Sequence, residues 1–336
     1  MNKNNISAID VVIPWVDGND PEWQRVYRKY VSQSNSLDSN TVSRYRDWDN
    51  LQFLFRGIEK FMPWVRTVHL VTCGQKPSWL NLDAPKLNFV RHEDFIPLEY
   101  LPTFSVRPIE LNIHRIQGLA DRFIYFNDDF FVLMPMEPTD FFKNGLPIDI
   151  AALDVLQAYS SRALVMANNT IIINNHFNKR DELRKHWNIW FKLSYGHFLI
   201  KTISLMRLSF FPAFLDTHLP QPYIKNTFEE VWRFYEHKLM EVSKHRFRDI
   251  SDVNQSLMRY WQIVSGKIHP ANVFKKRTYF LANDNNISSI VNAISAPKQP
   301  LLVINDSDEI ENFERVKNAV KEAFETLLPQ KSSFEL

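Results

Sequence analysis

Cysteine is nearly missing from this 336-residue sequence, and long apolar runs are missing altogether. Cys73 is the only cysteine, which excludes an intramolecular disulfide and a cysteine-based zinc site and is typical of a reducing compartment. No run approaches the ~18 apolar residues of a spanning helix. The segment from Met1 to Ser7 is short and polar, so we expect no signal peptide. Together these absences predict a cytoplasmic protein.

Strong charge of either sign is also lacking. The formal net charge is +2, and no block of basic residues resembles a footprint for a phosphate backbone, so we expect no nucleic-acid partner. Hydrophobic residues make up 45% of the chain, which is ordinary for a globular protein with a sizeable core. The length predicts two domains, or one large domain with an insertion. The 26 Phe and 9 Trp residues could form stacking surfaces.

The stretch from Phe123 to Phe131 is the most informative part of the sequence. Apolar and aromatic residues predict a buried strand, which Asn127, Asp128 and Asp129 interrupt. Adjacent carboxylates repel each other, and a hard divalent cation removes that cost. In open α/β sheets, ligands bind beyond the carboxyl ends of strands. The alternative is a tight turn in which these side chains bond their own backbone.

Three further strands precede this one, each followed by a helix or a turn. They cover Ile9–Val16, Val65–Thr72 and Leu87–Arg91. Asp20 as N-cap and Pro21 at the first position predict a helix after the first strand. Apolar residues from Leu51 to Phe61 keep the helical period and predict another. The pattern therefore predicts a doubly wound, mostly parallel α/β sheet of the Rossmann or GT-A type.

The second half has a different character and predicts a largely helical insertion. The expected domains are residues 1–145 as a nucleotide-sugar-binding core, 146–300 as a helical acceptor-side region, and 301–336 as a strand and helix that return to the core. Ala163–Asn174 could be a hairpin strand, and Lys179–Phe211 an amphipathic helical pair that packs on the core or touches a membrane surface. We expect further helices capped by Thr227 with Glu230 and by Ser251.

Several polar residues stand at positions that α/β proteins use for ligands, although each also has a plain structural explanation. Asp17 follows the first strand and Asp306 follows Leu301–Ile304, so we expect Asp17, Asp128 and Asp306 at one edge of the same sheet. Glu110 and His114 share a face of a helix that we expect to begin at Pro108; they could contact a metal or a sugar, or be an ordinary exposed pair.

Taken in order, these motifs resemble the Stealth proteins, which include bacterial capsular-polysaccharide hexose-1-phosphate transferases and the lysosomal-enzyme N-acetylglucosamine-1-phosphotransferase of animals. Four blocks carry the resemblance. They are Asp10 to Gly18; Arg44 to Asp129, with Leu101-Pro-Thr-Phe-Ser105, Glu110, His114 and Asn127-Asp128-Asp129; Thr217-His218-Leu219-Pro220 with Arg248 to Asp252; and Ile304-Asn305-Asp306 with Glu335. Together they span nearly the whole chain.

The resemblance implies that a sugar hydroxyl attacks the β-phosphorus of a UDP-sugar, such as a UDP-N-acetylglucosamine-type donor, and that UMP leaves. It implies Mg²⁺ or Mn²⁺ held by Asp128 and Asp129, with Asp128 and Asp17 among the catalytic residues and Asp17 either near the nucleotide end or the alternative base. Proton transfer by His218 and a phosphate clamp by Arg248 follow from the same resemblance. The remaining implied contacts are with the donor (Trp15, Asp17, Arg44, Thr72, Asn127, Asn305 and Asp306) and on the acceptor or supporting side (Glu110, His114 and Asp252).

The implied partners are a UDP-sugar and an oligosaccharide or lipid-linked glycan acceptor. The protein could also touch the cytoplasmic face of the inner membrane or the capsule assembly machinery. Two rival functions remain: a metal-dependent glycosyltransferase that releases UDP, and an inactive scaffold that binds sugar chains through its aromatic residues. Carboxylates after two separate strands argue against the scaffold.

Overall fold

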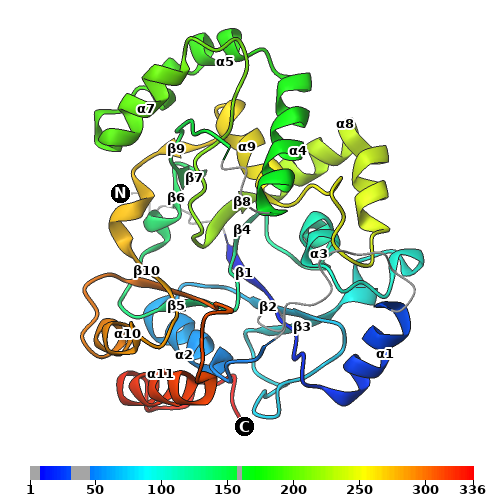
Figure 1. Cartoon of the computed structure of the whole chain (residues 1–336), viewed down its shortest axis with the longest axis vertical. Helices are drawn as coiled ribbons and strands as arrows, with labels where there is room; N and C mark the ends of the chain where they lie inside the picture. The colour runs from blue at the N-terminus through cyan, green and yellow to red at the C-terminus, as the bar shows by residue number, and fades with distance from the viewer. Residues whose placement is uncertain (1–7, 32–45, 157–160) are drawn as a thin grey trace. The chain divides into compact units, whose positions relative to one another are not determined.

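The computed structural model describes residues 8–31, 46–156 and 161–336, and it divides into two compact units (Figure 1). The first unit comprises residues up to Asp94, Ile124–Pro138 and Lys275–Leu336; the second comprises Phe95–Phe123 and Thr139–Phe274. These limits differ from the expected boundaries after residues 145 and 300. The segment before Phe123 packs with helices of the second half, and the segment after Lys275 pairs with the closing strand, which sequence order does not reveal.

Parallel strands form the first sheet of the first unit. β1 (Ile9–Pro14) pairs with β2 (Val68–Thr72), which pairs with β3 (Leu87–Arg91). β4 (Arg122–Tyr125) lies on the other side of β1, and just beyond it the Phe126 N–H donates to the Val12 carbonyl at 2.9 Å. Every residue of β2 is buried, as expected for a parallel strand covered on both faces. The predicted fold class, an α/β sheet with parallel strands, is confirmed.

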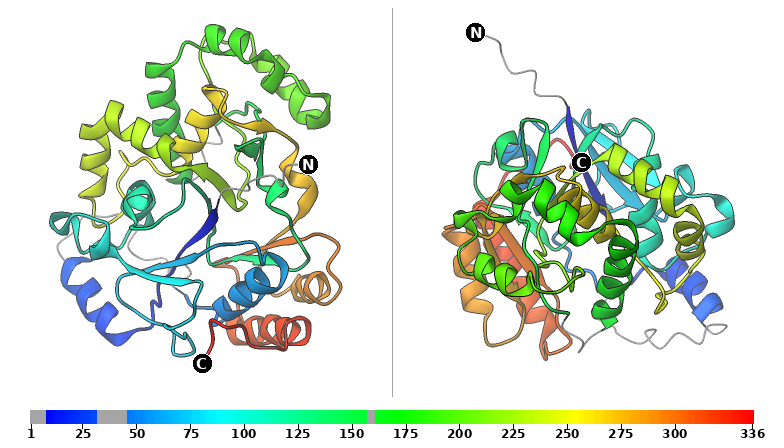
Figure 2. Two further views of the ribbon diagram at one scale, coloured as in Figure 1. Left: turned by 180° about the vertical axis from the view of Figure 1, so that it is seen from behind. Right: turned by 90° about the horizontal axis from the view of Figure 1, so that it is seen from above.

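The helices of the first unit follow the sequence signals closely. α1 (Pro21–Val31) begins where predicted, and its N-cap Asp20 accepts a hydrogen bond from the Trp23 N–H at 2.6 Å. α2 (Leu51–Phe61) buries the predicted apolar face. Two helices from the late part of the chain, α10 (Ile287–Ser295) and α11 (Phe313–Leu327), lie side by side. Figure 2 shows α11 in red beside α2 in blue, where Phe324 stacks on Phe53 at 5.2 Å.

A second, mixed sheet belongs to the same unit. β11 (Leu301–Asn305) runs parallel to β10 (Arg277–Leu281) and antiparallel to β5 (Phe130–Val132). Asp306 therefore follows a strand of this sheet, and the expectation that it shares a sheet with Asp17 and Asp128 is wrong. The two sheets are linked through the chain itself, because the turn between β4 and β5 carries Asn127, Asp128 and Asp129.

The second unit combines short strands with most of the helices. β7 (Leu146–Asp149) pairs antiparallel with β6 (Phe142–Lys143) and parallel with β9 (His269–Pro270). β8 (Gln221–Ile224) leads into α8 (Lys225–Ser243), which is kinked at Tyr235. The other helices of this unit are α3 (Val106–Asn112), α4 (Ser161–His176), α5 (Lys179–Lys185), α6 (Trp187–Trp190), α7 (His197–Leu205) and α9 (Ser256–Val264).

Four local predictions for the second unit are wrong. The expected hairpin strand Ala163–Asn174 is helical, because α4 packs on α9 and the Asn169 amide donates to Asn254 Oδ1 at 2.8 Å. α3 begins two residues before Pro108, since Ser105 caps it. The remaining two concern helix caps. Thr227 lies inside α8, and its hydroxyl donates to Gln262. Ser251 does not cap α9, because that helix begins five residues later and the Ser251 hydroxyl donates to Asp249.

The expected helical pair over Lys179–Phe211 consists of three short helices, α5, α6 and α7. Figure 1 shows α5 and α7 in green at one end of the second unit. In the part of the chain that the structure describes, no helix is both long and apolar enough to cross a membrane.

Candidate active site

The loops after β1 and β2 are fastened to each other in the first unit. The Asp17 N–H donates to Gln75 Oε1 at 3.0 Å, and the Gln75 amide donates to the Asp17 carbonyl at 2.7 Å. The Asp17 carboxylate accepts the Asn19 N–H at 2.8 Å, and Thr72 Oγ1 accepts the Gly74 N–H at 2.9 Å. Asp17 is thus held in a defined place at the carboxyl end of the parallel sheet.

Arg46 fixes the end of the second sheet. Its guanidinium binds both carboxylate oxygens of Asp306, one of them at 2.9 Å, and donates to the Ser307 carbonyl at 3.0 Å. The guanidinium also lies 4.1 Å from the centre of the Phe313 ring. The Asp306 carboxylate is therefore already engaged by a cation, and Arg46 joins the entrance of α2 to the end of β11.

Four acidic residues of the first unit, Asp17, Asp47, Asp128 and Asp129, influence one another; we call them the carboxylate cluster. Desolvation, followed by repulsion from Asp129 and Asp47, raises the pKa of Asp128 to about 7. Asp128 is exposed to solvent. Desolvation and the negative charge of Asp17 also raise the pKa of Asp47.

A divalent cation would offset the repulsion between the carboxylates of this cluster. Carboxylate oxygens are the ligands that Mg²⁺ and Mn²⁺ take, and Mg²⁺ commonly binds through one or two carboxylates together with substrate phosphates. Among the described residues, no group of three or more acidic, His or Cys side chains is arranged to hold a metal ion. The donor set therefore fits a cation held by Asp128 and Asp129 that completes its shell with water and a diphosphate, and it does not fit an all-protein cage.

The turn that carries Asp128 and Asp129 is held from both sides. The Phe130 N–H donates to the Asn127 carbonyl at 3.3 Å, and the Ile304 N–H donates to the Asp129 carbonyl at 3.0 Å. The latter bond brings β11, and hence the chain toward Asn305 and Asp306, next to the turn. Directly after β1, Trp15 is 9% exposed and its N–H donates to the Val71 carbonyl at 2.9 Å.

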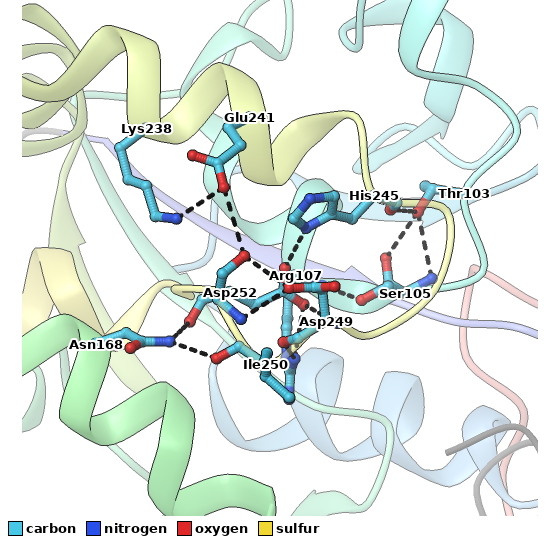
Figure 3. A network of polar contacts seen from close by, with 11 residues as sticks. Thr103, Ser105, Arg107, Asn168, Lys238, Glu241, His245, Asp249, Ile250 and Asp252 are labelled. Atoms are coloured by element: carbon cyan, nitrogen blue, oxygen red, sulfur yellow. Dashed lines mark hydrogen bonds and ion pairs between the residues drawn. The ribbon is translucent and has the colours of Figure 1, made fainter. Parts of the chain in front are cut away.

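In the second unit, a buried ion pair holds the loop that carries Arg248 (Figure 3). Arg107 Nη1 lies 2.6 Å from Asp252 Oδ2, and the fully buried Asp252 also accepts the Asp249 N–H at 3.0 Å. His245 Nδ1 lies 2.6 Å from Asp252 Oδ1, and this contact raises the pKa of His245. Both ends of the loop from His245 to Asp252 are therefore attached to one carboxylate.

A second buried ion pair holds the loop that carries His218. Arg259 binds both oxygens of Asp149 at 2.8 Å and donates to the Leu215 carbonyl at 2.8 Å. Gln221 Nε2 donates to Asp149 Oδ2 at 3.1 Å. The loop from Asp216 to Pro220 thus begins and ends at residues bound to one Arg–Asp pair, and His218 in its middle has a positive φ of 42°. This conformation is uncommon for histidine and shows that the surrounding contacts dictate the backbone.

Glu110 and His114 lie inside the second unit rather than on its surface. Glu110 is 5% exposed and His114 is 9% exposed. The imidazole of His114 stacks on Phe228 with ring centres 5.9 Å apart, and burial lowers its pKa to about 3. His114 is therefore neutral at physiological pH, and its surroundings are those of an interior residue.

The structure thus sorts the predicted site residues into two sets. In the first unit it gathers Asp17, Asp128 and Asp129, with Trp15, Thr72, Asn127, Asn305 and Asp306 on neighbouring strand ends. In the second unit, Asp252 supports the loop that carries Arg248. The ion pair between Arg259 and Asp149 supports the loop that carries His218. Arg44 lies outside the described residues.

Arg46 and Asp47 belong to the charged stretch before Leu51, in which two arginines and a carboxylate could grip a phosphate or a sugar or could be an ordinary solvated helix start. Sequence reasoning missed the other residues that hold these groups, because they are ordinary charged or amide residues in the sequence: Gln75, Arg107, Asp149 and Arg259.

Comparison with known proteins agrees with the motifs. The models of Stealth protein conserved regions 1 and 2 match residues 8–35 and 44–148. The chain is 35% identical over 334 residues to the capsular polysaccharide phosphotransferase WcwK of Streptococcus pneumoniae, covering 98% of this chain and 99% of that protein. It belongs to the Stealth family. The receptor polysaccharide phosphotransferase WefC of Streptococcus gordonii is 38% identical over 98% of this chain and 100% of its own length.

A third Stealth relative is the exopolysaccharide phosphotransferase cps2G of Lactiplantibacillus plantarum, which is 36% identical over 97% of this chain and 96% of its own length. Full-length similarity to several phosphotransferases makes this Stealth protein an enzyme of the transferase class. The crystal structure of the galactosyltransferase LgtC aligns over 93% of this chain and 95% of its own, with 11% identity and a TM-score of 0.40, which is too low to support a conclusion.

Proposed function

We propose that this Stealth protein transfers a hexose-1-phosphate from a UDP-sugar to a hydroxyl group of a growing capsular or cell-surface polysaccharide. The acceptor oxygen bonds to the β-phosphorus of the donor, the bond from that phosphorus to the bridging oxygen breaks, and UMP leaves with the electron pair. The hydroxyl proton passes to a base. A phosphodiester then links the transferred hexose to the acceptor.

The carboxylate cluster carries this proposal. A nucleotide diphosphate would bring a divalent cation to Asp128 and Asp129, and that cation would neutralise charge on the diphosphate and the leaving UMP. Asp17 lies on the fastened loop after β1, at the carboxyl end of the parallel sheet, which suits the nucleotide end of the donor. Relatives of 35–38% identity that are polysaccharide phosphotransferases support the same assignment.

His218 and Arg248 have the chemistry that the remaining tasks require. An imidazole can take the proton of the acceptor hydroxyl. A guanidinium binds two phosphate oxygens with its planar fork, which a lysine cannot reproduce. Each stands on a loop whose ends are held by a buried Arg–Asp pair, so each side chain would be positioned before the substrate arrives.

The proposed donor is UDP-N-acetylglucosamine or another UDP-N-acetylhexosamine, and the proposed acceptor is an oligosaccharide or a lipid-linked glycan. The proposed place of action is the cytoplasm, at the inner membrane where capsule assembly proteins gather.

Identification of the nucleotide product tests the proposal. The full-length protein is incubated with a panel of UDP-sugars, an oligosaccharide acceptor and Mg²⁺, and the nucleotides are separated by chromatography. We expect UMP to form in proportion to a phosphodiester-linked product, and ³¹P NMR should show the phosphorus in that product. Release of UDP with a product that lacks phosphorus would replace phosphotransfer by ordinary glycosyl transfer.

A further inference from the structure

The segment from Leu183 to Leu215 has an unusual distribution of charge. Its 33 residues contain no Asp or Glu, although acidic residues are as frequent as basic ones in the whole chain, with 38 against 40. The five basic residues in the segment are Arg184, Lys185, Lys192, Lys201 and Arg207. Three of them pair with acids just outside the segment: Arg184 with Asp181, Lys185 with Glu182 and Lys201 with Asp154. The positive charge that the segment offers to an anionic surface is therefore carried mainly by Lys192 and Arg207.

The same segment exposes large apolar side chains along α6, α7 and the turns beside them. Leu193 is 90% exposed, Ile200 71%, Trp187 63%, Phe210 51% and Ile203 50%. Ile200 and Ile203 are three residues apart and lie on one face of α7, and Arg207 follows that helix within one turn of Ile203. Scattered exposed apolar residues are normal on a soluble protein, but a concentration of them within one basic segment marks an interaction surface.

The opposite face of α7 is firmly attached to the second unit. Thr202 is fully buried, and its hydroxyl oxygen accepts the Leu153 N–H at 3.0 Å. The buried Lys179 ammonium donates to the Leu205 and Leu208 carbonyls, both at 2.9 Å, and so satisfies the end of α7. Phe198 stacks on Phe274 at 5.0 Å. The exposed face of α7 is therefore presented by a supported helix and is not left open by fraying.

We propose that α6, α7 and the turns beside them (Trp187–Phe210) bind the surface of an anionic lipid bilayer, with the exposed apolar side chains in the headgroup region and the basic side chains on lipid phosphates. Tryptophan, phenylalanine and isoleucine next to lysine and arginine are the composition of helices that lie in a membrane interface. The long stems of Lys192 and Arg207 allow their charges to reach the headgroups while the neighbouring apolar groups insert. This deepens the proposed place of action by naming the surface that would contact the membrane, although binding itself requires neither donor nor acceptor.

Vesicle sedimentation with the full-length protein tests the proposal. The vesicles contain phosphatidylglycerol and phosphatidylethanolamine, and a second set contains phosphatidylcholine alone. We expect the protein to bind the anionic vesicles, to bind the neutral ones weakly, and to lose affinity as salt rises. The variant Ile200→Asp/Ile203→Asp should bind at least about tenfold less, because two apolar anchors are replaced by charges that the lipid phosphates repel.

The matched control is Leu164→Asp/Ile171→Asp, which changes two exposed apolar residues on α4 of the same unit, 47% and 55% exposed. We expect it to bind like the unchanged protein, and circular dichroism checks that both variants fold. Equal losses in the two variants, equal binding to neutral and anionic vesicles, or no binding by the unchanged protein would overturn the proposal. Light scattering that shows a dimer dissociated by Ile200→Asp/Ile203→Asp, without vesicle binding, would assign the surface to a second copy instead.

Discussion

Asp149 and Asp252 of the second unit face arginine, whereas Asp128 and Asp129 of the first unit face other carboxylates. Arg259 and Arg107 bring a full positive charge to the former pair at 2.6–2.8 Å. In the carboxylate cluster, desolvation and then repulsion from Asp129 and Asp47 raise the pKa of Asp128 instead. The charge of a buried acid is compensated when the protein places an arginine beside it, and such an ion pair can hold loops in place. The charges of acids that repel one another are compensated only when a cation binds to them.

The comparison also shows that a charged residue in a sequence motif can have either a structural role or a chemical role. Asp252 and Asp128 both belong to motifs of the Stealth resemblance, yet the first is internally neutralised and the second is not. The difference predicts opposite responses to mutation. Removing the carboxylate of Asp252 should lower the folding stability, because this group has no direct chemical role. Removing the carboxylate of Asp128 should lower turnover and leave the stability unchanged.

Neutralising the cluster should give the largest effect. For Asp128→Asn/Asp129→Asn, we expect turnover to fall by about 10³-fold or more, which corresponds to the several kcal/mol that a divalent cation contributes. The midpoint of thermal unfolding at pH 8 without metal should be unchanged or higher, since like charges have been removed. UMP release and thermal unfolding are the measurements, and chelation by EDTA should abolish activity until Mg²⁺ is restored.

The control for that variant is Asp83→Asn, an exposed acid of the same unit outside the cluster. It should keep normal turnover. Normal activity of the double variant in excess chelator would remove the metal from the proposal.

Loss of the imidazole at position 218 should give the next largest effect. We expect kcat to fall by about 10²–10⁴-fold, the usual contribution of general acid–base catalysis, while the KM for the donor changes little. His218→Asn is the better variant, because asparagine tolerates the positive φ at this position more readily than alanine does. Steady-state kinetics decide the outcome, with the exposed His237→Asn as control; a kcat within about two-fold of normal would show that His218 is only a loop residue.

Breaking the ion pair beneath that loop should act on stability. Arg259→Ala leaves the buried Asp149 carboxylate without its cation, so we expect the free energy of unfolding to fall by about 3–5 kcal/mol, or the protein to fail to fold. Urea titration followed by circular dichroism measures the change. Lys238→Ala, which breaks a more exposed pair with Glu241 in the same unit, should leave the stability nearly unchanged. A folded Arg259→Ala protein with a normal unfolding midpoint would contradict the comparison.

The smallest effect concerns pH. The contact with Asp252 raises the pKa of His245 in the folded state, so its stabilisation is fully present below a pH of about 6.5 and is lost as pH rises through the higher folded-state value. The stability difference between the unchanged protein and His245→Gln should therefore be larger at pH 5.5 than at pH 8.5. Urea titrations across this range measure it. A difference that stays constant with pH would mean that the imidazole does not carry the charge.

Local patterns were sufficient for the strands and helices of the first unit. Apolar runs located β1 and β2, a cap located α1, and the helical period of apolar residues located α2, because these signals lie within a few residues of one another. The same reasoning gave a wrong prediction for the segment Ala163–Asn174, which is helical. Its isoleucines favour a strand, but Ile173 is buried where α4 packs on α9, and tertiary packing outweighed the local preference.

The supports of the candidate site lay beyond the reach of sequence patterns. Arg107 and Asp252 are 145 residues apart in the sequence, and Asp149 and Arg259 are 110 residues apart. No local sequence pattern can therefore indicate which residues form these pairs. The cluster at Asp128 was visible because two acids interrupt an apolar strand. The roles of His218 and Arg248 came from the family resemblance and stay predictions.

The division of the first unit into three stretches of sequence has a consequence for synthesis of the protein. Lys275–Leu336 leaves the ribosome last, yet Phe324 of α11 covers Phe53 of α2 and Phe131 of β5, and Glu335 binds the Arg56 guanidinium at 2.6 and 2.8 Å. The groups made first must stay without these partners until the chain has grown by roughly 190 to 280 further residues. Nascent chains of this protein should therefore depend on chaperones until translation is nearly complete.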